Sequence, residues 1–328
     1  SELTDTITKI KVKLMQVKDV RGTANRVTES QILDDIELFE LKAFSLLVVE
    51  MRELLLSANI TVVSLPDLEP VVNILDPEKM RIPHFYVYDA YSPELAALRA
   101  KMKTLKMDEK TEERVLDQLQ FEHTELEDQI REKLSEQIHP YKKEINEALT
   151  NTATLDILLA KAQQTIDMQL CKPEISSGTT RYIKIFDPQV KEVLWQEGKK
   201  FQAIDIDIEQ GACLITGANM AGKTVLLKSV QLAQYLMQFG FYVPARRAGM
   251  PLVEQVLTSI GDDQDELNGL SSYAAEMLRV DEMIRQVRQR SKILVLIDEL
   301  ARTTNPVEGR AIVNGVVDFL TTHRVMAM

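Results

Sequence analysis

The chain has 328 residues and a formal net charge of −11. Hydrophobic residues make up 45% of it and charged residues 27%, which is typical of a globular protein long enough for two domains. The acidic balance argues against a protein whose whole surface grips phosphate backbones, because such binding depends on clustered Lys and Arg.

The chain shows no sign of secretion or of a membrane anchor. Its first residues, SELTDTITKIKVKLM, lack the apolar core of a signal peptide, and no apolar run approaches the roughly 18 residues that a membrane span requires. Cys171 and Cys213 form no CxxC pair, which is typical of reduced thiols, and the four histidines are too scattered to predict a metal site. We therefore expect a cytoplasmic protein with no membrane partner.

Glycine is distributed unevenly along the chain. Of the 12 glycines, only Gly22 precedes residue 178. Helices disfavour glycine, whereas nucleotide-binding α/β domains need it for turns and for close approach of the backbone to a ligand. This distribution predicts an all-helical domain over residues 1–168 and an α/β domain over residues 169–328, with a turn after Pro173 near the boundary.

The first domain is expected to consist of helices. Residues 32–56 place apolar side chains at helical spacing, and Ser92 before Pro93 is a typical helix start. Residues 108–138 predict one long charged helix, which Pro140 kinks or ends before the helix resumes. The apolar face of this long helix comprises Leu116, Leu119, Leu126, Ile130, Leu134 and Ile138. These features predict a structural antiparallel helix pair with a coiled-coil-like seam and no catalytic role.

The second domain is expected to alternate strands with helices. Residues 181–188 and 201–209 alternate apolar and polar side chains, and residues 211–217 and 292–300 have the composition of buried strands. Residues 222–240 predict an amphipathic helix. This order predicts an α/β fold with a mainly parallel sheet covered by helices.

The most specific motif is the segment GANMAGKT, which fits the pattern GxxxxGK[ST] between a predicted strand and a predicted helix. It comprises Gly217, Ala218, Asn219, Met220, Ala221, Gly222, Lys223 and Thr224. In such a loop the backbone N–H groups and the helix N-terminus meet the phosphates of a nucleotide. The lysine lies between the β- and γ-phosphates and the threonine reaches Mg²⁺, so the motif predicts a bound nucleotide with Mg²⁺.

Two acids follow the second buried strand, in the segment ILVLIDEL. We interpret Asp298 as a ligand in the Mg²⁺ shell and Glu299 as the residue that orients and deprotonates water in line with the γ-phosphate. The alternative is a pair of helix-capping acids, but the presence of Lys223 upstream favours the functional interpretation. A water-activating acid also argues against a small-molecule kinase, so the pair predicts hydrolysis of the nucleotide.

These motifs resemble the MutS family, the DNA mismatch-recognition ATPases of the ABC class. The likeness is carried by LITGANMAGKTVLLKSVQLAQYLMQFGFYVPA, IGDDQDELNGLSSYAAEM and LVLIDELARTTNPVEGRA, and less closely by DDIELFELK and ILDPEKMRIPHFYVYDAYSPELAALRAKM. It covers most of the chain and is closest to MutS paralogues that lack the mismatch-reading domain. The resemblance implies a helical core and lever followed by an ABC-type P-loop ATPase domain, with ATP and Mg²⁺ as cofactors and composite sites in a homodimer.

The resemblance also implies roles for single residues. The phosphate loop and the two acids keep the roles given above. Ser271, at the start of a predicted helix, would act in trans on the ATP bound by the other subunit, and Leu270 precedes it where the family has a basic residue. Phe201 matches the aromatic that stacks on adenine, with an ordinary core position as the alternative.

The chain departs from the family pattern within its best-matched motifs. Ala218 and Ala221 stand where the loop usually has Pro and Gly, a change that Gly222 makes tolerable because it keeps the close approach to the phosphates. Ala301 and Thr303 occupy small glycine positions after the two acids, which predicts a stiffer loop facing the partner subunit.

Three parts of the family pattern are not visible in this sequence. No mismatch-reading domain precedes the helices, and no DNA clamp interrupts residues 97–120. Residues 105–150 contain 13 acids against 7 Lys and Arg, a balance that would repel a phosphate backbone. Residues 325–328 resemble the start of the strand that ends in the family's γ-phosphate-sensing histidine, which His323 is not. We therefore expect a sequence cut short before that histidine and the dimerising segment.

What the ATPase acts on stays open between two hypotheses. The family implies DNA binding of the mismatch-repair or recombination type. The absence of a clamp and the acidic lever instead favour an ATPase that remodels or reactivates a partner enzyme, for example a cobalamin-dependent aminomutase. A third alternative, a nucleotide-stabilised scaffold, is disfavoured by Glu299. Under both leading hypotheses we expect an ATP-gated homodimer.

Overall fold

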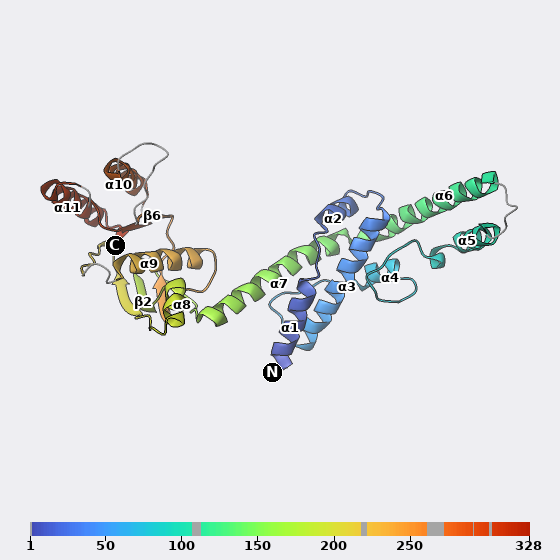
Figure 1. The fold of residues 1–328 in the computed structure, drawn as a ribbon, viewed down its shortest axis with the longest axis horizontal. Helices are drawn as coiled ribbons and strands as arrows, with labels where there is room; N and C mark the ends of the chain where they lie inside the picture. The colour runs from blue at the N-terminus through green and yellow to red at the C-terminus, as the bar shows by residue number, and fades with distance from the viewer. Residues whose placement is uncertain (1, 107–112, 218–221, 261–271, 291, 302–303) are drawn as a thin grey trace. The chain divides into compact units, whose positions relative to one another are not determined.

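The computed structural model describes residues 2–106, 113–217, 222–260, 272–290, 292–301 and 304–328. The chain divides into two compact units, Ser1–Ala160 and Lys161–Met328 (Figure 1). An all-helical unit is thus followed by an α/β unit, which confirms the predicted fold class. The units part inside a long helix, whereas the predicted domain boundary at residue 168 coincides with the end of that helix.

The helical unit is built from long helices joined by short connections. Its described elements are α1 (Glu2–Leu14), α2 (Arg21–Thr28), α3 (Asp35–Ser57), α4 (Glu69–Leu75), η1 (Asp89–Tyr91), α5 (Pro93–Lys106), α6 (Glu113–Ile138), η2 (His139–Tyr141) and α7 (Lys142–Met168). α5 and α6 run antiparallel, and α7 continues from the end of α6 (Figure 1). None of the helices within the described ranges combines the length and the apolar composition that a membrane crossing requires.

Two helix starts show why these segments are helical. At α3 the Asp34 side chain accepts a hydrogen bond from the Glu37 N–H at 2.9 Å, and the Glu37 carboxylate accepts one from the Asp34 N–H at 2.9 Å. This reciprocal capping satisfies donors that the first helical turn leaves unpaired. At α5 the Ser92 hydroxyl accepts from the Leu95 N–H at 3.3 Å. The helix start predicted at Ser92 is therefore confirmed, and the helix predicted over residues 32–56 is observed as α3.

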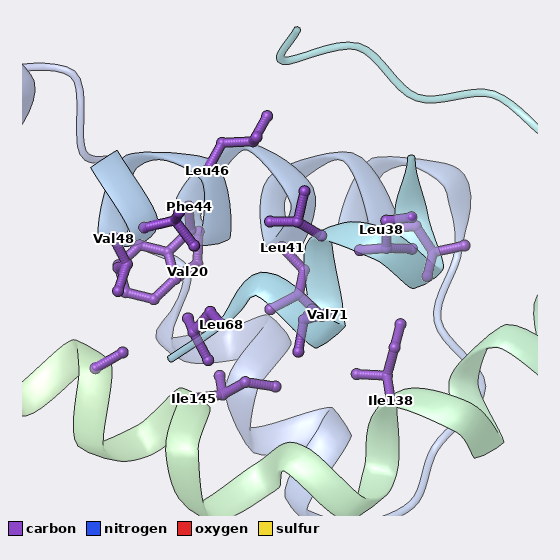
Figure 2. Close-up of a cluster of buried hydrophobic side chains, with 14 of the residues drawn as sticks. Val20, Leu38, Leu41, Phe44, Leu46, Val48, Leu68, Val71, Ile138 and Ile145 are labelled. Atoms are coloured by element: carbon purple, nitrogen blue, oxygen red, sulfur yellow. The ribbon is translucent and has the colours of Figure 1, made fainter. Parts of the chain in front are cut away.

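The core of the helical unit lies where α3 and α4 meet the α6–α7 junction. Leu38 and Leu41 of α3, Val71 of α4, Ile138 of α6 and Ile145 of α7 are all completely buried (Figure 2). Burying each such aliphatic side chain contributes about 1.5–3 kcal/mol relative to leaving it in water. This shared core fixes the antiparallel α3 and α4 against the long helices.

The apolar face predicted for the long helix is confirmed in α6. Leu119, Ile130 and Leu134 are buried along one face of this helix. Pro140 lies in the short η2 between α6 and α7, as its missing N–H and its fixed φ angle require. The Arg99 guanidinium of α5 donates to the Glu127 carboxylate of α6 at 2.7 Å, which ties the antiparallel pair together.

A buried ion pair lies at the centre of this unit. The Lys42 ammonium, with a side chain 0% exposed, donates to the Asp76 carboxylate at 2.9 Å, and Asp76 is 2% exposed. Lys42 also donates to the Tyr88 hydroxyl at 3.0 Å, which in turn donates to the His84 carbonyl at 3.0 Å. The Arg81 N–H donates to the other Asp76 oxygen at 2.7 Å. Both charges are therefore paired and hydrogen-bonded, as burial demands.

The network also sets the ionisation of its carboxylate. Burial by itself raises the pKa of Asp76, but hydrogen bonds from the Lys42 ammonium and from the Arg81 N–H outweigh it and hold that pKa below its ordinary value. The ionised carboxylate therefore stabilises the folded state above the unfolded-state pKa of about 3.9. This contribution is lost as the pH falls through the lower folded-state pKa.

The α/β unit contains two sheets. Its described elements are β1 (Glu174–Ile175), β2 (Thr180–Ile185), α8 (Pro188–Gln196), β3 (Ile204–Ile208), β4 (Gly211–Ala212), α9 (Lys223–Gln238), β5 (Arg247–Met250), β6 (Gln255–Ser259), α10 (Ser272–Gln289), β7 (Ile293–Ile297), α11 (Pro306–Thr322) and β8 (Met326–Ala327). The first sheet has the order β1-β5-β2-β3, in which β2 runs antiparallel to both neighbours. The second has the order β4-β8-β7-β6 and is parallel throughout.

The parallel sheet is built around β7. Ile293, Leu294, Val295 and Leu296 are all buried, as expected for a strand covered on both faces. Its neighbours β6 and β8 both pair with it in parallel. Residues 325–328 thus begin a strand, as predicted, and this strand lies between β4 and β7.

The predicted buried strand over residues 211–217 is wrong in its extent. The strand β4 ends at Ala212, and Leu214 is 69% exposed. Beyond the two paired residues, the Cys213 N–H still donates to the Ala327 carbonyl at 2.8 Å.

Helix α8 was not among the predicted elements. The Asp187 side chain accepts hydrogen bonds from the N–H groups of Gln189 at 2.9 Å and Val190 at 3.0 Å, and Pro188 occupies the first helical position. An acidic N-cap followed by Pro is a recognised helix start. The signal was present in the sequence, at the end of a segment assigned to a strand.

We predict that Asp76→Ala destabilises the helical unit by about 3–5 kcal/mol, because it leaves the Lys42 ammonium buried without its counter-charge. The measurement is hydrogen exchange of the most protected amides in α3. Tryptophan fluorescence does not serve, since the single tryptophan, Trp195, belongs to the other unit. The half-exposed Arg81–Glu69 pair supplies the control. Glu69→Gln should cost less than about 1 kcal/mol, and an equal loss in both variants would contradict the role given to the buried pair.

Candidate nucleotide site

The site lies at the carboxyl end of the parallel sheet. After Ile297 the chain leaves β7 and reaches Asp298, whose N–H donates to the Ser259 carbonyl at the end of β6 at 2.8 Å. This bond continues the parallel ladder by one residue and fixes where the acid stands. Ligands of open α/β sheets bind at this edge, because the carboxyl ends of parallel strands and the helix N-termini converge there.

The helix α9 begins at the described end of the phosphate loop. Its N-cap, Gly222, has φ 85° and ψ 17°, in the left-handed region that disfavours side chains. The first helical residues are Lys223 and Thr224. The unpaired N–H groups and the partial positive charge of this helix end suit a phosphate group. Glycine at position 222 is therefore required by the backbone conformation and not by lack of space.

The Lys223 side chain spans the phosphate loop. Its ammonium group donates to the Gly217 carbonyl at 3.0 Å, although the two residues are six positions apart. The first and seventh residues of the motif are thus brought together. The predicted loop residues Ala218, Asn219, Met220 and Ala221 lie outside the described residues. The lysine is positioned where a phosphate bound by the loop would replace the carbonyl as its partner.

The threonine and the first acid meet directly. The Thr224 hydroxyl donates to the Asp298 carboxylate at 2.5 Å, across 74 residues of sequence. A hydroxyl and a carboxylate are oxygen ligands of the kind that a hard divalent cation prefers. Mg²⁺ commonly binds through one or two protein oxygens together with substrate phosphates and water, so this donor set fits Mg²⁺. The two predicted metal ligands are thus brought together.

The second acid follows on a constrained backbone. Glu299 is exposed and has φ 50°, and Ala301 has φ 61°. Both values lie in the left-handed region, which costs a residue other than glycine about 1 kcal/mol or more and persists only where neighbours enforce it. Ala301 stands where the resembled family has glycine. Its backbone therefore adopts a conformation that glycine would take without strain.

Two helices hold this loop in place. The Glu276 carboxylate of α10 accepts a hydrogen bond from the Ala301 N–H at 2.8 Å. On the α11 side, a Cβ added to Gly309 would lie 3.3 Å from the Ala301 carbonyl and 3.2 Å from the Thr304 methyl group. The loop that carries Glu299 is thus anchored by a carboxylate on one side and by close packing on the other. Sequence reasoning did not single out Glu276, although it lies within the segment SSYAAEM.

A cavity of about 230 Å³ opens beside these residues. Lys223, Asp298 and Glu299 supply its charged lining, and the remaining lining is apolar and comes mainly from α11 and from residues 212–215. Phe201 does not line it, and its predicted contact with adenine is untested. Ser271 lies outside the described residues. The structure therefore gathers the loop lysine, the threonine and both acids, but not the predicted aromatic.

Comparison with known proteins agrees with this geometry. Residues 213–328 match the family model described as MutS domain V. The chain is 30% identical over 196 residues to the DNA mismatch repair protein MutS of Streptococcus gordonii, which is 60% of this chain and 23% of that protein. It is 31% identical over 212 residues to MutS of Chloroflexus aurantiacus, which is 64% of this chain and 22% of that protein. The chain thus spans less than a quarter of the length of these relatives.

We predict that Glu276→Ala lowers the turnover number for ATP about tenfold or more with little change in KM. Loss of the anchor to Ala301 lets the loop carrying Glu299 move away from its working position, and small displacements at a reacting centre are costly. Glu276→Gln keeps a carbonyl acceptor and should retain most of the activity. Steady-state hydrolysis of ATP by the purified variants is the measurement.

The control for this prediction is Glu282→Ala, on an exposed part of the same helix. Its carboxylate accepts a hydrogen bond from Gln286 within α10 and is not among the contacts of the Glu299 loop. Glu282→Ala should leave turnover unchanged. Equal activity in Glu276→Ala and Glu282→Ala would overturn the positioning role of Glu276.

Proposed function

We propose that this chain binds ATP with Mg²⁺ and hydrolyses it, because residues 213–328 match the family model described as MutS domain V. The observation that carries the proposal is the hydrogen bond from the Thr224 hydroxyl to the Asp298 carboxylate, at the N-terminus of α9 and beside Lys223. A phosphate-binding helix end and an oxygen donor pair for a divalent cation therefore adjoin one cavity.

Each residue has a physical task in this proposal. The N–H groups at the start of α9 and the Lys223 ammonium bind the β- and γ-phosphates. Thr224 and Asp298 hold Mg²⁺, which supplies positive charge against the triphosphate when bound. Glu299, exposed beside them, orients a water molecule and accepts its proton as the water attacks the γ-phosphate.

We further propose that two copies of the chain share each ATP. The MutS resemblance implies that Ser271 would act on the ATP bound by the other copy. Ser271 directly precedes α10, and Glu276 of the same helix anchors Ala301 in the loop that carries Glu299. ATP bound by the partner at the start of α10 would thus affect the position of the loop that carries Glu299, because α10 connects the two. The same family relation supports a cytoplasmic homodimer that closes on ATP.

For the target, the first candidate is DNA. The relatives named above are DNA mismatch repair proteins, and their match extends over 60% or more of this chain. Under this proposal ATP binding and hydrolysis would switch the helical unit between states that bind DNA differently. DNA binding of the mismatch-repair or recombination type is then the function that follows from family.

The second candidate is a partner enzyme, and one observation favours it. The exposed face of α6 carries the acids Asp117, Glu122, Glu125, Asp128, Glu132 and Glu136. Arg114 and Lys133 are the exposed cations of that helix within its described residues. Such a face repels a phosphate backbone and attracts a basic protein surface. An ATPase that remodels a protein such as a cobalamin-dependent aminomutase fits this charge better.

We predict that Glu299→Gln traps ATP in a dimer. The amide keeps the size of the side chain but cannot accept the proton of the attacking water, so turnover should fall at least about 100-fold while ATP stays bound. Size-exclusion chromatography with light scattering and bound-nucleotide analysis measure both effects. Lys223→Ala, which removes a phosphate-binding charge, is the matched control and should retain neither ATP nor the dimer. Failure of Glu299→Gln to retain ATP would remove the water-activating role from Glu299.

We predict that DNA and protein targets separate by their dependence on salt. If DNA is the target, the protein should bind mismatched, branched or homoduplex DNA with an affinity that falls steeply as salt rises, and binding should stimulate ATP hydrolysis. Titrations of each DNA at increasing ionic strength, with hydrolysis followed in parallel, are the measurement. Absence of binding even at low salt would refute the DNA candidate and leave the partner-enzyme candidate standing.

A further inference from the structure

A basic groove lies on the first sheet of the α/β unit. It has a volume of about 420 Å³ and is lined by Lys172, Arg181, Arg246 and Arg247 together with one acid, Glu174. All five of these side chains belong to exposed residues. The groove shares no lining residue with the cavity beside Lys223, so it is a separate site.

The strand register explains why the cations gather there. Arg181 of β2 pairs with Gly249 of β5, and Ile183 pairs with Arg247. Side chains two positions apart on a strand share a face, so Arg181 and Arg247 stand on the same face of two adjacent strands. The residue between them in register, Tyr182, is 1% exposed and points to the core instead. Two guanidinium groups therefore stand on neighbouring strands at diagonal positions.

Most of the groove cations have no ion-pair partner among the residues that the structure describes. No described residue forms an ion pair with Lys172, Arg246 or Arg247. Arg181 has one, with Asp207 at 3.2 Å, but both side chains are more than 60% exposed and water weakens the attraction. By contrast, Arg131 of the helical unit contacts three acids. Unpaired like charges placed close together repel one another, and an anion would relieve that repulsion.

The chemistry of the groove selects among anions. Three of its four cations are arginines, whose planar guanidinium groups donate paired hydrogen bonds to phosphate oxygens. None of the described residues that line it is aromatic, so these residues offer no platform on which a base could stack. Glu174 pairs with Gly249 on one side and Asp207 pairs with Arg181 on the other, so acids flank the cations on both sides. A long polyanion crossing the strands would meet both carboxylates, whereas a compact anion inside the groove would meet only Glu174.

The geometry points to a binding site for the phosphate group of a small phosphorylated molecule, held by Arg181, Arg246, Arg247 and Lys172. The lining carries a formal charge of +3 from four cations and one carboxylate. A phosphate monoester carries close to two negative charges at neutral pH, which this lining can neutralise. A phosphorylated metabolite or cofactor would bind there to the α/β unit. The site shares no lining residue with the cavity beside Lys223, so this binding would not require ATP hydrolysis.

The test uses pyrophosphate as the probe and calorimetric titration at low salt as the readout. The full chain carries Lys223→Ala, so that the nucleotide loop does not contribute. We expect one bound pyrophosphate per chain, with an affinity that falls at least about tenfold when Arg246→Gln and Arg247→Gln are added, because each removes charge-assisted hydrogen bonds. Arg290→Gln with Arg310→Gln, exposed cations elsewhere in the same unit, is the matched control and should change nothing.

Three outcomes would overturn the proposal. One is an unchanged affinity in the Arg246/Arg247 double variant and also in a second variant, Lys172→Gln with Arg181→Gln. Another is an equal loss in the Arg290/Arg310 control. The third is binding of a single-stranded oligothymidine, but not of pyrophosphate, that depends on the groove arginines, which would identify a nucleic-acid backbone as the ligand. The groove variants, made without Lys223→Ala, should hydrolyse ATP at the parental rate, so failure of the groove and failure of the ATPase proposal are distinguishable.

Discussion

The parallel order of the second sheet is the constraint on which the nucleotide site depends. With β4, β8, β7 and β6 running in one direction, the segments that leave β4 and β7 emerge at the same edge. This brings the loop that begins at Gly217 beside Asp298 and Glu299, and the Thr224–Asp298 hydrogen bond closes the junction at 2.5 Å. Reversing a single strand would carry the acids to the opposite edge. The parallel strand direction thus determines which side chains meet at the site.

The two units differ in the feature that is most relevant to a switch: a buried ion pair in the helical core, and a strained loop beside the candidate site in the α/β unit. The helical unit is consolidated by a continuous core and by one buried ion pair, Lys42 with Asp76, whose partners are all satisfied. In the α/β unit, Glu299 and Ala301 adopt left-handed conformations in the loop that follows β7. Such strained backbone is typical of positions that act on a ligand. The proposed ATP-driven switch would use both a stable helical core and a strained loop at the nucleotide site.

Much of this site could be predicted from sequence because its signals are local. The glycine, lysine and threonine of the phosphate loop follow one another within a few residues, and the predicted helix start at Ser92 is equally local. Helix α8 was missed although its N-cap signal at Asp187 is local, but two other misses depended on distant partners. Glu276 acts through Ala301, 25 positions away, so no local pattern marked it. The basic groove was missed for the same reason, since strand register alone brings Arg181 to Arg247.

The central claim is that Thr224 and Asp298 together hold the divalent cation of a bound nucleotide. It is tested most directly by titrating Mn²⁺, as a paramagnetic substitute for Mg²⁺, into the ATP-bound protein and following it by electron paramagnetic resonance. The account predicts that Thr224→Val and Asp298→Asn each weaken Mn²⁺ binding at least about tenfold, since each removes a ligand to the ion. ATP binding measured without the metal should persist in both variants. Unchanged Mn²⁺ affinity in both would contradict the account.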